Sequence, residues 1–127
     1  MKKKKSIVVV DDEGDFTEMA KILLEKTGFF EVGVCNYGID ALEMIRDWKP
    51  DLVLLDIMMP GMDGTEIASK LREDKDLASI PVMFSTSLVT ASEASESPLI
   101  AKYPFISKPI GGEALVKRLR EFFQIEN

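Results

Sequence analysis

The stretch from Leu52 to Gly64, LVLLDIMMPGMDG, constrains the fold of this chain more than any other part of it. It places a single carboxylate, Asp56, at the end of an apolar run and shortly before a turn that contains one proline and two glycines. An apolar run bounded by turn residues predicts a strand buried on both faces, as in a parallel sheet between layers of helices. Asp56 would then lie at the carboxyl end of that strand, where open α/β sheets bind ligands.

Composition limits the kind of protein. The chain has 127 residues, 46% of them hydrophobic, which predicts one domain over residues 1–127 with a basic lead-in at 1–5. Acidic residues outnumber basic ones by 22 to 16, which argues against direct nucleic-acid binding. The lone cysteine, Cys35, excludes an internal disulfide and favours the cytoplasm. The apolar run at 7–10 is too short for a signal peptide or a membrane span.

Apolar runs typical of strands alternate with helical stripes along the whole chain. The predicted strands are 6–10, 30–36, 52–56, 80–86 and 102–107, and the predicted helices are 16–27, 39–48, 65–73, a short helix within 87–98, and 111–124. This alternation implies right-handed crossovers, a parallel sheet and helices on both of its faces.

Polar side chains end four of these strands, so the fold would gather them at one edge of the sheet. They are Asp11 and Asp12, then Asp56, Thr86 and Lys108. Three carboxylates and one ammonium leave a local charge of about −2, which is costly without a cation or a proton. Mg²⁺ prefers oxygen ligands and would neutralise the cluster.

Such a site suits phosphoryl transfer. An ionised Asp56 is positioned as a nucleophile toward phosphorus, and its attack on a phosphoryl donor gives an acyl phosphate. Mg²⁺ and Lys108 would meet the phosphoryl oxygens, and the Thr86 hydroxyl would donate to one of them.

Four motifs in this order resemble the receiver domain of two-component response regulators over residues 5–121. They are the acidic pair at 11–12, LLDIMMPGMDG around Asp56, PVMFST ending at Thr86, and Lys108-Pro109. The resemblance implies a flavodoxin-like, doubly wound (βα)5 fold with a five-stranded parallel sheet in the order 2-1-3-4-5. It also implies that the chain is a signalling domain and not an enzyme. Such a domain catalyses its own phosphorylation and its own slow dephosphorylation.

The resemblance also implies roles for single residues. Asp56 would be the phosphoacceptor, Asp12 a direct Mg²⁺ ligand, Asp11 a ligand through water, and the main-chain carbonyl of Met58 a further ligand. The apolar side chains of Met58 and Leu88, at positions that flank the phosphoryl group in the family, would exclude water and slow hydrolysis.

Two further positions match the family's switch residues. Thr86 corresponds to the hydroxyl residue that moves to the phosphoryl group. Phe105 corresponds to the aromatic residue that swings inward with it, although packing in the core is the competing interpretation of Phe105.

The implied partners are a sensor histidine kinase or phosphotransfer protein and a downstream effector domain or protein. Because the chain contains no histidine, the phosphoryl donor must be a separate molecule. The output face would comprise the fourth helix, fifth strand and fifth helix. A phosphorylation-dependent dimer is left as an alternative and is not carried over from the family, since Pro98 and Pro104 make this face atypical.

Three alternatives compete with this hypothesis. A haloacid-dehalogenase-like Mg²⁺-dependent phosphatase would want a second aspartate at position 58, where this chain has Met58. A flavodoxin-like cofactor binder would want a phosphate-binding loop after the first strand, where this chain has carboxylates. A receiver fold that serves only as an interaction module is disfavoured because every required group is present.

Local packing can also be predicted. Met58, Met59, Met62 and Trp48 are expected to pack in the interior, as is Cys35. Asp63 is expected to cap the helix that follows it.

Overall fold

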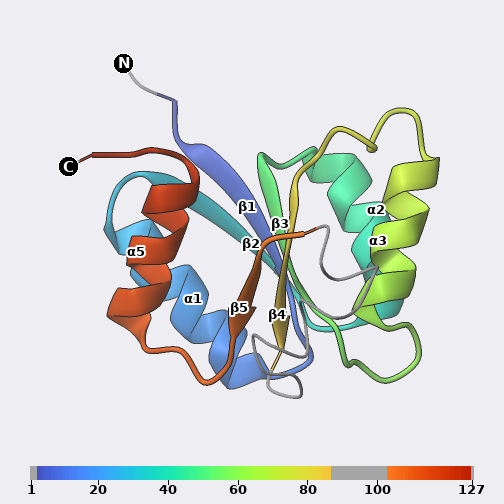
Figure 1. Cartoon of the computed structure of the whole chain (residues 1–127), viewed down its shortest axis with the longest axis horizontal. Helices are drawn as coiled ribbons and strands as arrows, with labels where there is room; N and C mark the ends of the chain where they lie inside the picture. Colours follow the sequence, from blue (N-terminus) through green and yellow to red (C-terminus); the bar gives the residue numbers. More distant parts are fainter. Residues whose placement is uncertain (1–2, 87–102, 127) are drawn as a thin grey trace.

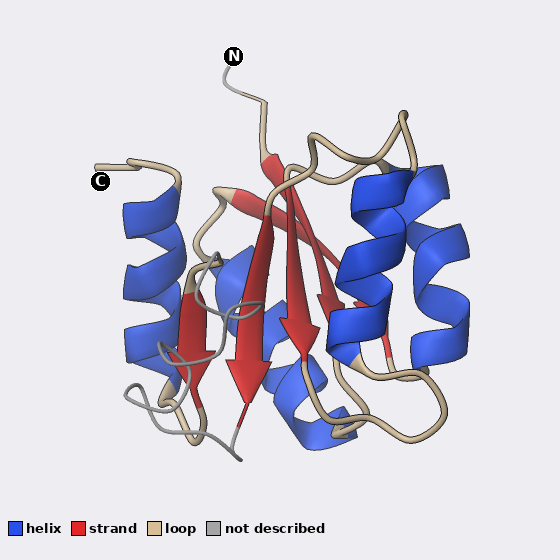
Figure 2. Ribbon diagram, turned by 45° about the vertical axis from the view of Figure 1, so that its right-hand side comes forward, coloured by secondary structure: helices blue, strands red, loops and turns tan. Residues whose placement is uncertain are grey.

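The computed structural model describes residues 3–86 and 103–126 and contains a five-stranded parallel sheet in the order β2-β1-β3-β4-β5. Its strands are β1 (Lys5–Val10), β2 (Phe30–Cys35), β3 (Leu52–Asp56), β4 (Val82–Thr86) and β5 (Phe105–Ser107). The arrowheads in Figure 2 point the same way, so all carboxyl ends share one edge. The predicted fold class and strand order are confirmed.

Four helices of the described residues cover the two faces of the sheet: α1 (Gly14–Lys26), α2 (Gly38–Trp48), α3 (Gly64–Glu73) and α5 (Gly112–Phe122). Helices α1 and α5 lie on one face, and α2 and α3 lie on the other (Figure 1). The short helix predicted within 87–98 lies outside the described residues.

The core is divided by the sheet into two apolar clusters, because successive side chains of a strand point to opposite faces. Val53 and Leu55 of β3 belong to the cluster under α2 and α3, whereas Leu52 and Leu54 belong to the one under α1 and α5. All of β3 is buried, as the uninterrupted apolar run predicts. The strand that carries Asp56 is therefore held from both sides.

Prolines shorten two strands relative to the prediction. The fifth strand was expected from residue 102 but begins at Phe105, and the fourth begins at Val82 rather than at residue 80. Pro104 and Pro81 precede these starts, and neither has an N–H for the ladder. The Pro104 carbonyl still accepts a hydrogen bond from the Phe84 N–H at 3.0 Å.

Packing predictions are confirmed for some residues and wrong for others. Met59 and Cys35 are buried, but the Met58 side chain is 55% exposed because it lies on the loop after β3. Trp48 is 36% exposed, and its ring packs against the edge strand β2 at Gly33, where an added Cβ would come within 2.7 Å of the ring.

The predicted cap of α3 is present. The Asp63 carboxylate accepts the Glu66 N–H at 3.0 Å and the Thr65 hydroxyl at 2.7 Å. Among the described residues, every helix falls short of the length and apolar character needed to cross a membrane.

Candidate functional site

The carboxyl edge of the sheet brings together four of the predicted site residues. Asp11 and Asp12 directly follow β1, Asp56 is the last residue of β3, and Lys108 directly follows β5. Thr86 ends β4, where its backbone pairs with Ser107. The register of the parallel strands aligns these positions, because Val10 pairs with Leu55 and Asp56 pairs with Ser85.

Three carboxylates form a compact cluster. One oxygen from each of Asp11, Asp12 and Asp56 lies within 4.8 Å of the others. Asp11 is fully buried and Asp56 is 4% exposed, whereas Asp12 is exposed. The cluster is thus set into the edge of the sheet with one carboxylate facing solvent.

Lys108 supplies positive charge beside this cluster. Its ammonium donates to Asp11 Oδ2 at 2.7 Å and to Glu13 Oε1 at 2.7 Å, and it lies 4.8 Å from the centre of the Phe16 ring. The Lys108–Pro109 peptide bond is cis. Only 5% of the lysine side chain is exposed, so the charge lies within the site.

Asp56 has too little compensation to stay fully ionised at neutral pH. Burial, and next the negative charge of Asp11, raise its pKa to about 7, although Lys108 and the N–H of Met58 act in the opposite direction. With a pKa of about 7, the Asp56 carboxyl group is only about half ionised at neutral pH, and a bound cation would favour its ionised form. Additional positive charge at the site would therefore stabilise the ionised form of Asp56.

Two other predicted residues, Met58 and Phe105, are not part of the carboxylate cluster. The backbone N–H of Met58 lies near enough to Asp56 to lower its pKa, while the Met58 side chain is exposed. Phe105 is partly buried in β5 beside Phe84, and it packs against the cluster under α2 and α3.

Three supporting residues were missed by the sequence reasoning. Glu13 binds Lys108, and the Asn36 side chain donates to the Asp11 carbonyl at 2.9 Å. Gly64 approaches the strand so closely that a Cβ there would overlap the carbonyl oxygen of Asp56. For Glu13 the DDEGD run was a usable signal, whereas the contacts of Asn36 and Gly64 depend on tertiary placement.

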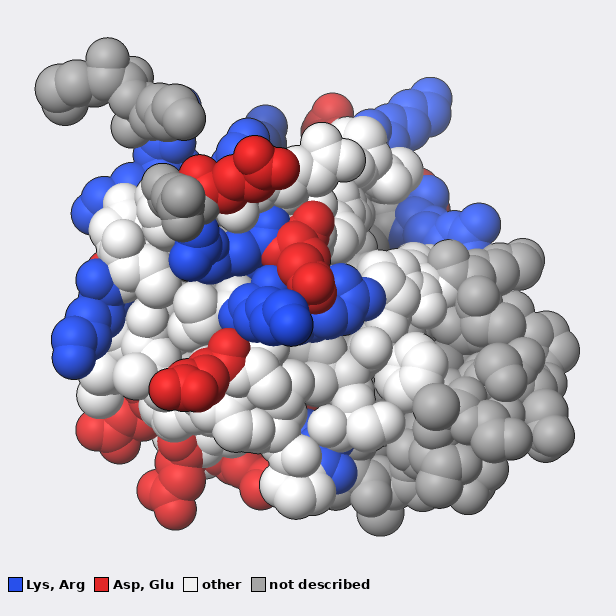
Figure 3. Space-filling view, turned by 60° about the vertical axis from the view of Figure 1, so that its left-hand side comes forward, with Lys and Arg blue, Asp and Glu red and all other residues white. Residues whose placement is uncertain are grey.

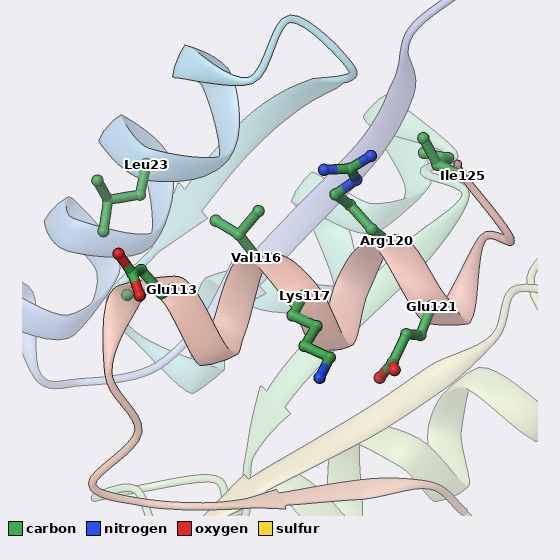
Figure 4. A pocket seen from close by; sticks show the side chains of 8 residues that line it. Leu23, Glu113, Val116, Lys117, Arg120, Glu121 and Ile125 are labelled. Atoms are coloured by element: carbon green, nitrogen blue, oxygen red, sulfur yellow. The ribbon is translucent and has the colours of Figure 1, made fainter. Parts of the chain in front are cut away.

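A separate groove lies between α1 and α5. It has a volume of about 440 Å³, and Figure 4 shows Leu23 of α1 across from Val116 and Glu113 of α5. On the face that carries α5, acidic and basic side chains lie next to one another (Figure 3). The groove does not include any residue of the carboxylate cluster.

The donor set fits a hard divalent cation. Mg²⁺ is bound through carboxylate and carbonyl oxygens and keeps several waters, and the cluster offers carboxylates at close range with one of them open to solvent. A bound cation would also stabilise the ionised form of Asp56, which burial and the charge of Asp11 disfavour.

Comparison with known proteins decides the family. The model of the response regulator receiver domain matches residues 7–120. The chain belongs to this family. Receiver domains are the input modules of two-component response regulators, so the function predicted at this coarser level is confirmed.

Curated relatives support the assignment. The DNA-binding response regulator MtrA of Mycobacterium tuberculosis is 37% identical over 114 residues, covering 90% of this chain and 48% of MtrA. The phosphate regulon regulator PhoB of Pseudomonas aeruginosa is 34% identical over 116 residues, covering 91% of this chain and 50% of PhoB. The chain spans about half the length of these relatives.

Solved structures agree. The receiver domain of the response regulator NarL from Mycobacterium tuberculosis has a TM-score of 0.81 and 27% identity, covering 98% of this chain and 100% of that one. The receiver domain of a DNA-binding response regulator from Colwellia psychrerythraea has a TM-score of 0.81 and 26% identity, covering 95% and 99%.

Proposed function

We propose that this receiver domain accepts a phosphoryl group on Asp56 from a phosphohistidine of a sensor kinase or phosphotransfer protein, with Mg²⁺ as cofactor. The observation that carries the proposal is the grouping of Asp56 with Asp11 and Asp12 within 4.8 Å, beside the buried ammonium of Lys108. A carboxylate flanked by metal-ligating oxygens and one cation has the positions that phosphoryl transfer needs.

In this reaction an Asp56 oxygen forms a bond to phosphorus while the bond from phosphorus to the donor nitrogen breaks. The electron pair of that bond stays on the imidazole, and Asp56 becomes an acyl phosphate. Bound Mg²⁺ would supply positive charge to the phosphoryl oxygens and hold Asp56 ionised.

The protein's own residues have distinct roles. Asp11, Asp12 and the Met58 carbonyl are the proposed metal ligands, with Asp11 acting through water. Lys108 is proposed to pair with a phosphoryl oxygen, and Thr86 to donate its hydroxyl to another. The Met58 side chain is 55% exposed, and its role in excluding water from the acyl phosphate stays a prediction. Leu88, the other residue of that prediction, lies outside the described residues.

The proposed output begins with Thr86 and Phe105. Movement of Thr86 toward the phosphoryl group would be coupled to inward rotation of Phe105, whose partial burial leaves it room to move. The output face around β5 and α5 would then contact an effector domain or protein, or a second copy of the chain. Slow loss of the acyl phosphate would end the signal.

Phosphorylation can be tested on the protein with acetyl phosphate and Mg²⁺. Intact mass should rise by one phosphoryl group in the wild type and in Asp47→Asn, which alters an exposed aspartate of α2, but not in Asp56→Asn. Equal modification of all three proteins would refute Asp56 as the acceptor. No modification of any would favour an interaction module that works without phosphorylation.

A further inference from the structure

Lys108 has two anionic partners, and only one of them belongs to the carboxylate cluster. Asp11 and Glu13 each accept a hydrogen bond from its ammonium at 2.7 Å. Asp11 is fully buried and is one of the three clustered carboxylates, whereas the Glu13 side chain is 60% exposed and lies outside that cluster. A ligand bound in the carboxylate cluster would therefore act directly on Asp11 but not on Glu13.

Most of the hydrogen-bonding capacity of the Lys108 ammonium is directed away from Asp56. An ammonium has three N–H donors, and here two are directed to Asp11 and Glu13 while the Phe16 ring lies 4.8 Å away. Asp56 acts on Lys108 through its charge. To meet a phosphoryl oxygen on Asp56, the ammonium must give up at least part of this arrangement.

A divalent cation in the cluster would act on only one of the two contacts directly. Its charge would compete with the ammonium for Asp11 and would repel the ammonium, which would weaken the pair between Lys108 and Asp11. The pair with Glu13 would persist, because Glu13 is not part of the cluster. Glu13 would remain as the competitor for Lys108 in the metal-loaded protein.

We propose that Glu13 is a positioning residue that latches Lys108 in the unphosphorylated domain and competes with the phosphoryl group on Asp56 for its ammonium. This inference rests on the proposed function. The latch sets how strongly the activated form is favoured. Because one partner is exposed, removing it should change that equilibrium by about two- to fivefold.

The test compares beryllofluoride affinity in saturating Mg²⁺, since beryllofluoride on Asp56 stands in for the phosphoryl group. Glu13→Gln should bind about two- to fivefold more tightly than the wild type. Glu18→Gln, which removes the same charge from an exposed position of α1, should bind like the wild type. Glu13→Asp keeps the charge but is one methylene shorter, so it should resemble Glu13→Gln.

A second measurement follows the latch without beryllofluoride. Proton exchange of the Lys108 ammonium, observed by ¹⁵N NMR, should be faster in Glu13→Gln than in the wild type or Glu18→Gln. A merely structural role of Glu13 would leave this exchange rate unchanged.

The outcomes separate the two proposals. Unchanged or weaker beryllofluoride binding by Glu13→Gln, with normal binding by the wild type, overturns the latch alone. An equal gain in Glu18→Gln also overturns it, because net charge would then explain the effect. A wild type that does not bind beryllofluoride refutes the proposed function and the latch together.

Discussion

Two buried aspartates at neighbouring strand ends have different surroundings. Asp11 accepts hydrogen bonds from the Lys108 ammonium at 2.7 Å and from the Glu13 N–H at 2.9 Å. Asp56 is 4% exposed, and its pKa is raised to about 7 chiefly by burial, although the N–H of Met58 acts to lower it. The residue proposed to react is thus the one whose charge is least compensated.

This difference predicts a pH-dependent stability. The folded-state pKa of Asp56 lies above its ordinary value of 3.8, so ionisation opposes folding. The cost is absent below about pH 4, grows up to about pH 7 and is constant above that. Without Mg²⁺, Asp56→Asn should raise the free energy of unfolding by about 2 kcal/mol or more at pH 7.5, and by much less at pH 4.5.

Urea unfolding of both proteins at several pH values measures this difference. Asp47→Asn, at an exposed position, should leave the profile of the wild type unchanged. A gain for Asp56→Asn that is the same at every pH would contradict the burial argument.

Gly64 illustrates a constraint of the backbone on the same site. A Cβ there would overlap the Asp56 carbonyl oxygen and lie 2.9 Å from the Asp56 carbonyl carbon, and neither can move without shifting the strand end. Gly64→Ala should therefore lower the free energy of unfolding by about 1–3 kcal/mol. Gly14→Ala is the matched control, because Gly14 also begins a helix but has nothing within 4 Å of the added Cβ.

Thermal unfolding of the two alanine variants tests this contrast. Gly14→Ala should be neutral or stabilising by up to about 1 kcal/mol, since alanine favours the helix. Similar stability of both variants would show that the end of β3 can shift to make room for the added Cβ without lowering the free energy of unfolding.

At the scale of elements, helix α1 protects the edge strand β2. The Lys21 ammonium donates to the Val32 carbonyl at 2.7 Å, and the Glu25 carboxylate accepts the Val32 N–H at 3.1 Å. The two side chains also pair with each other at 3.2 Å. Unpaired backbone groups of an edge strand can form hydrogen bonds with a strand of another chain. Lys21 and Glu25 occupy the backbone groups of Val32 and so block such pairing at this position.

Removing both side chains should therefore expose the edge. In Lys21→Ala/Glu25→Ala, amide exchange at Val32 should become faster, and association at high protein concentration should increase. Glu66→Ala/Lys70→Ala removes an exposed pair of the same spacing from α3 and should do neither. Hydrogen exchange by NMR and sedimentation velocity measure the two effects, and unchanged Val32 exchange would contradict the protective role.

The same contact should weaken in acid. The pKa of Glu25 is lowered, chiefly because the Val32 N–H donates to its carboxylate. Its contribution is present above the ordinary carboxyl pKa and is lost as the pH falls through the lowered value. Exchange at Val32, corrected for its intrinsic pH dependence, should report that loss.

At the scale of the molecule, the sheet separates two apolar clusters and leaves the charged groups at one edge. Folding therefore concentrates like charges that the unfolded chain keeps apart. A ligand that binds only this arrangement stabilises the folded state through mass action.

Mg²⁺ should therefore stabilise the whole domain. At about 100 times its dissociation constant, the gain is about 2.7 kcal/mol for one site. Calorimetry at constant ionic strength should show the shift in the wild type and in Asp47→Asn, and a much smaller one in Asp12→Asn. An equal shift in Asp12→Asn would refute its proposed role as a ligand.

The sequence by itself determined the five strands and the four helices of the described residues, the parallel arrangement of the strands, and the placement of Asp11, Asp12, Asp56 and Lys108 at one edge. Apolar runs that end in polar residues carry this information locally, because burial on both faces and parallel connections follow from the pattern. Two strands begin after their prolines, at Val82 and Phe105, whereas the prediction included Pro81 and Pro104 in the strands.

Only the tertiary structure decided which partners these groups have. The contact between Lys108 and Glu13, the approach of Gly64 to Asp56, the protection of Val32 by α1 and the exposure of Met58 all depend on how distant segments meet. No local periodicity encodes such distances, since side-chain paths between elements are set by packing. The sequence therefore placed the candidate site residues, and the structure showed what holds them there.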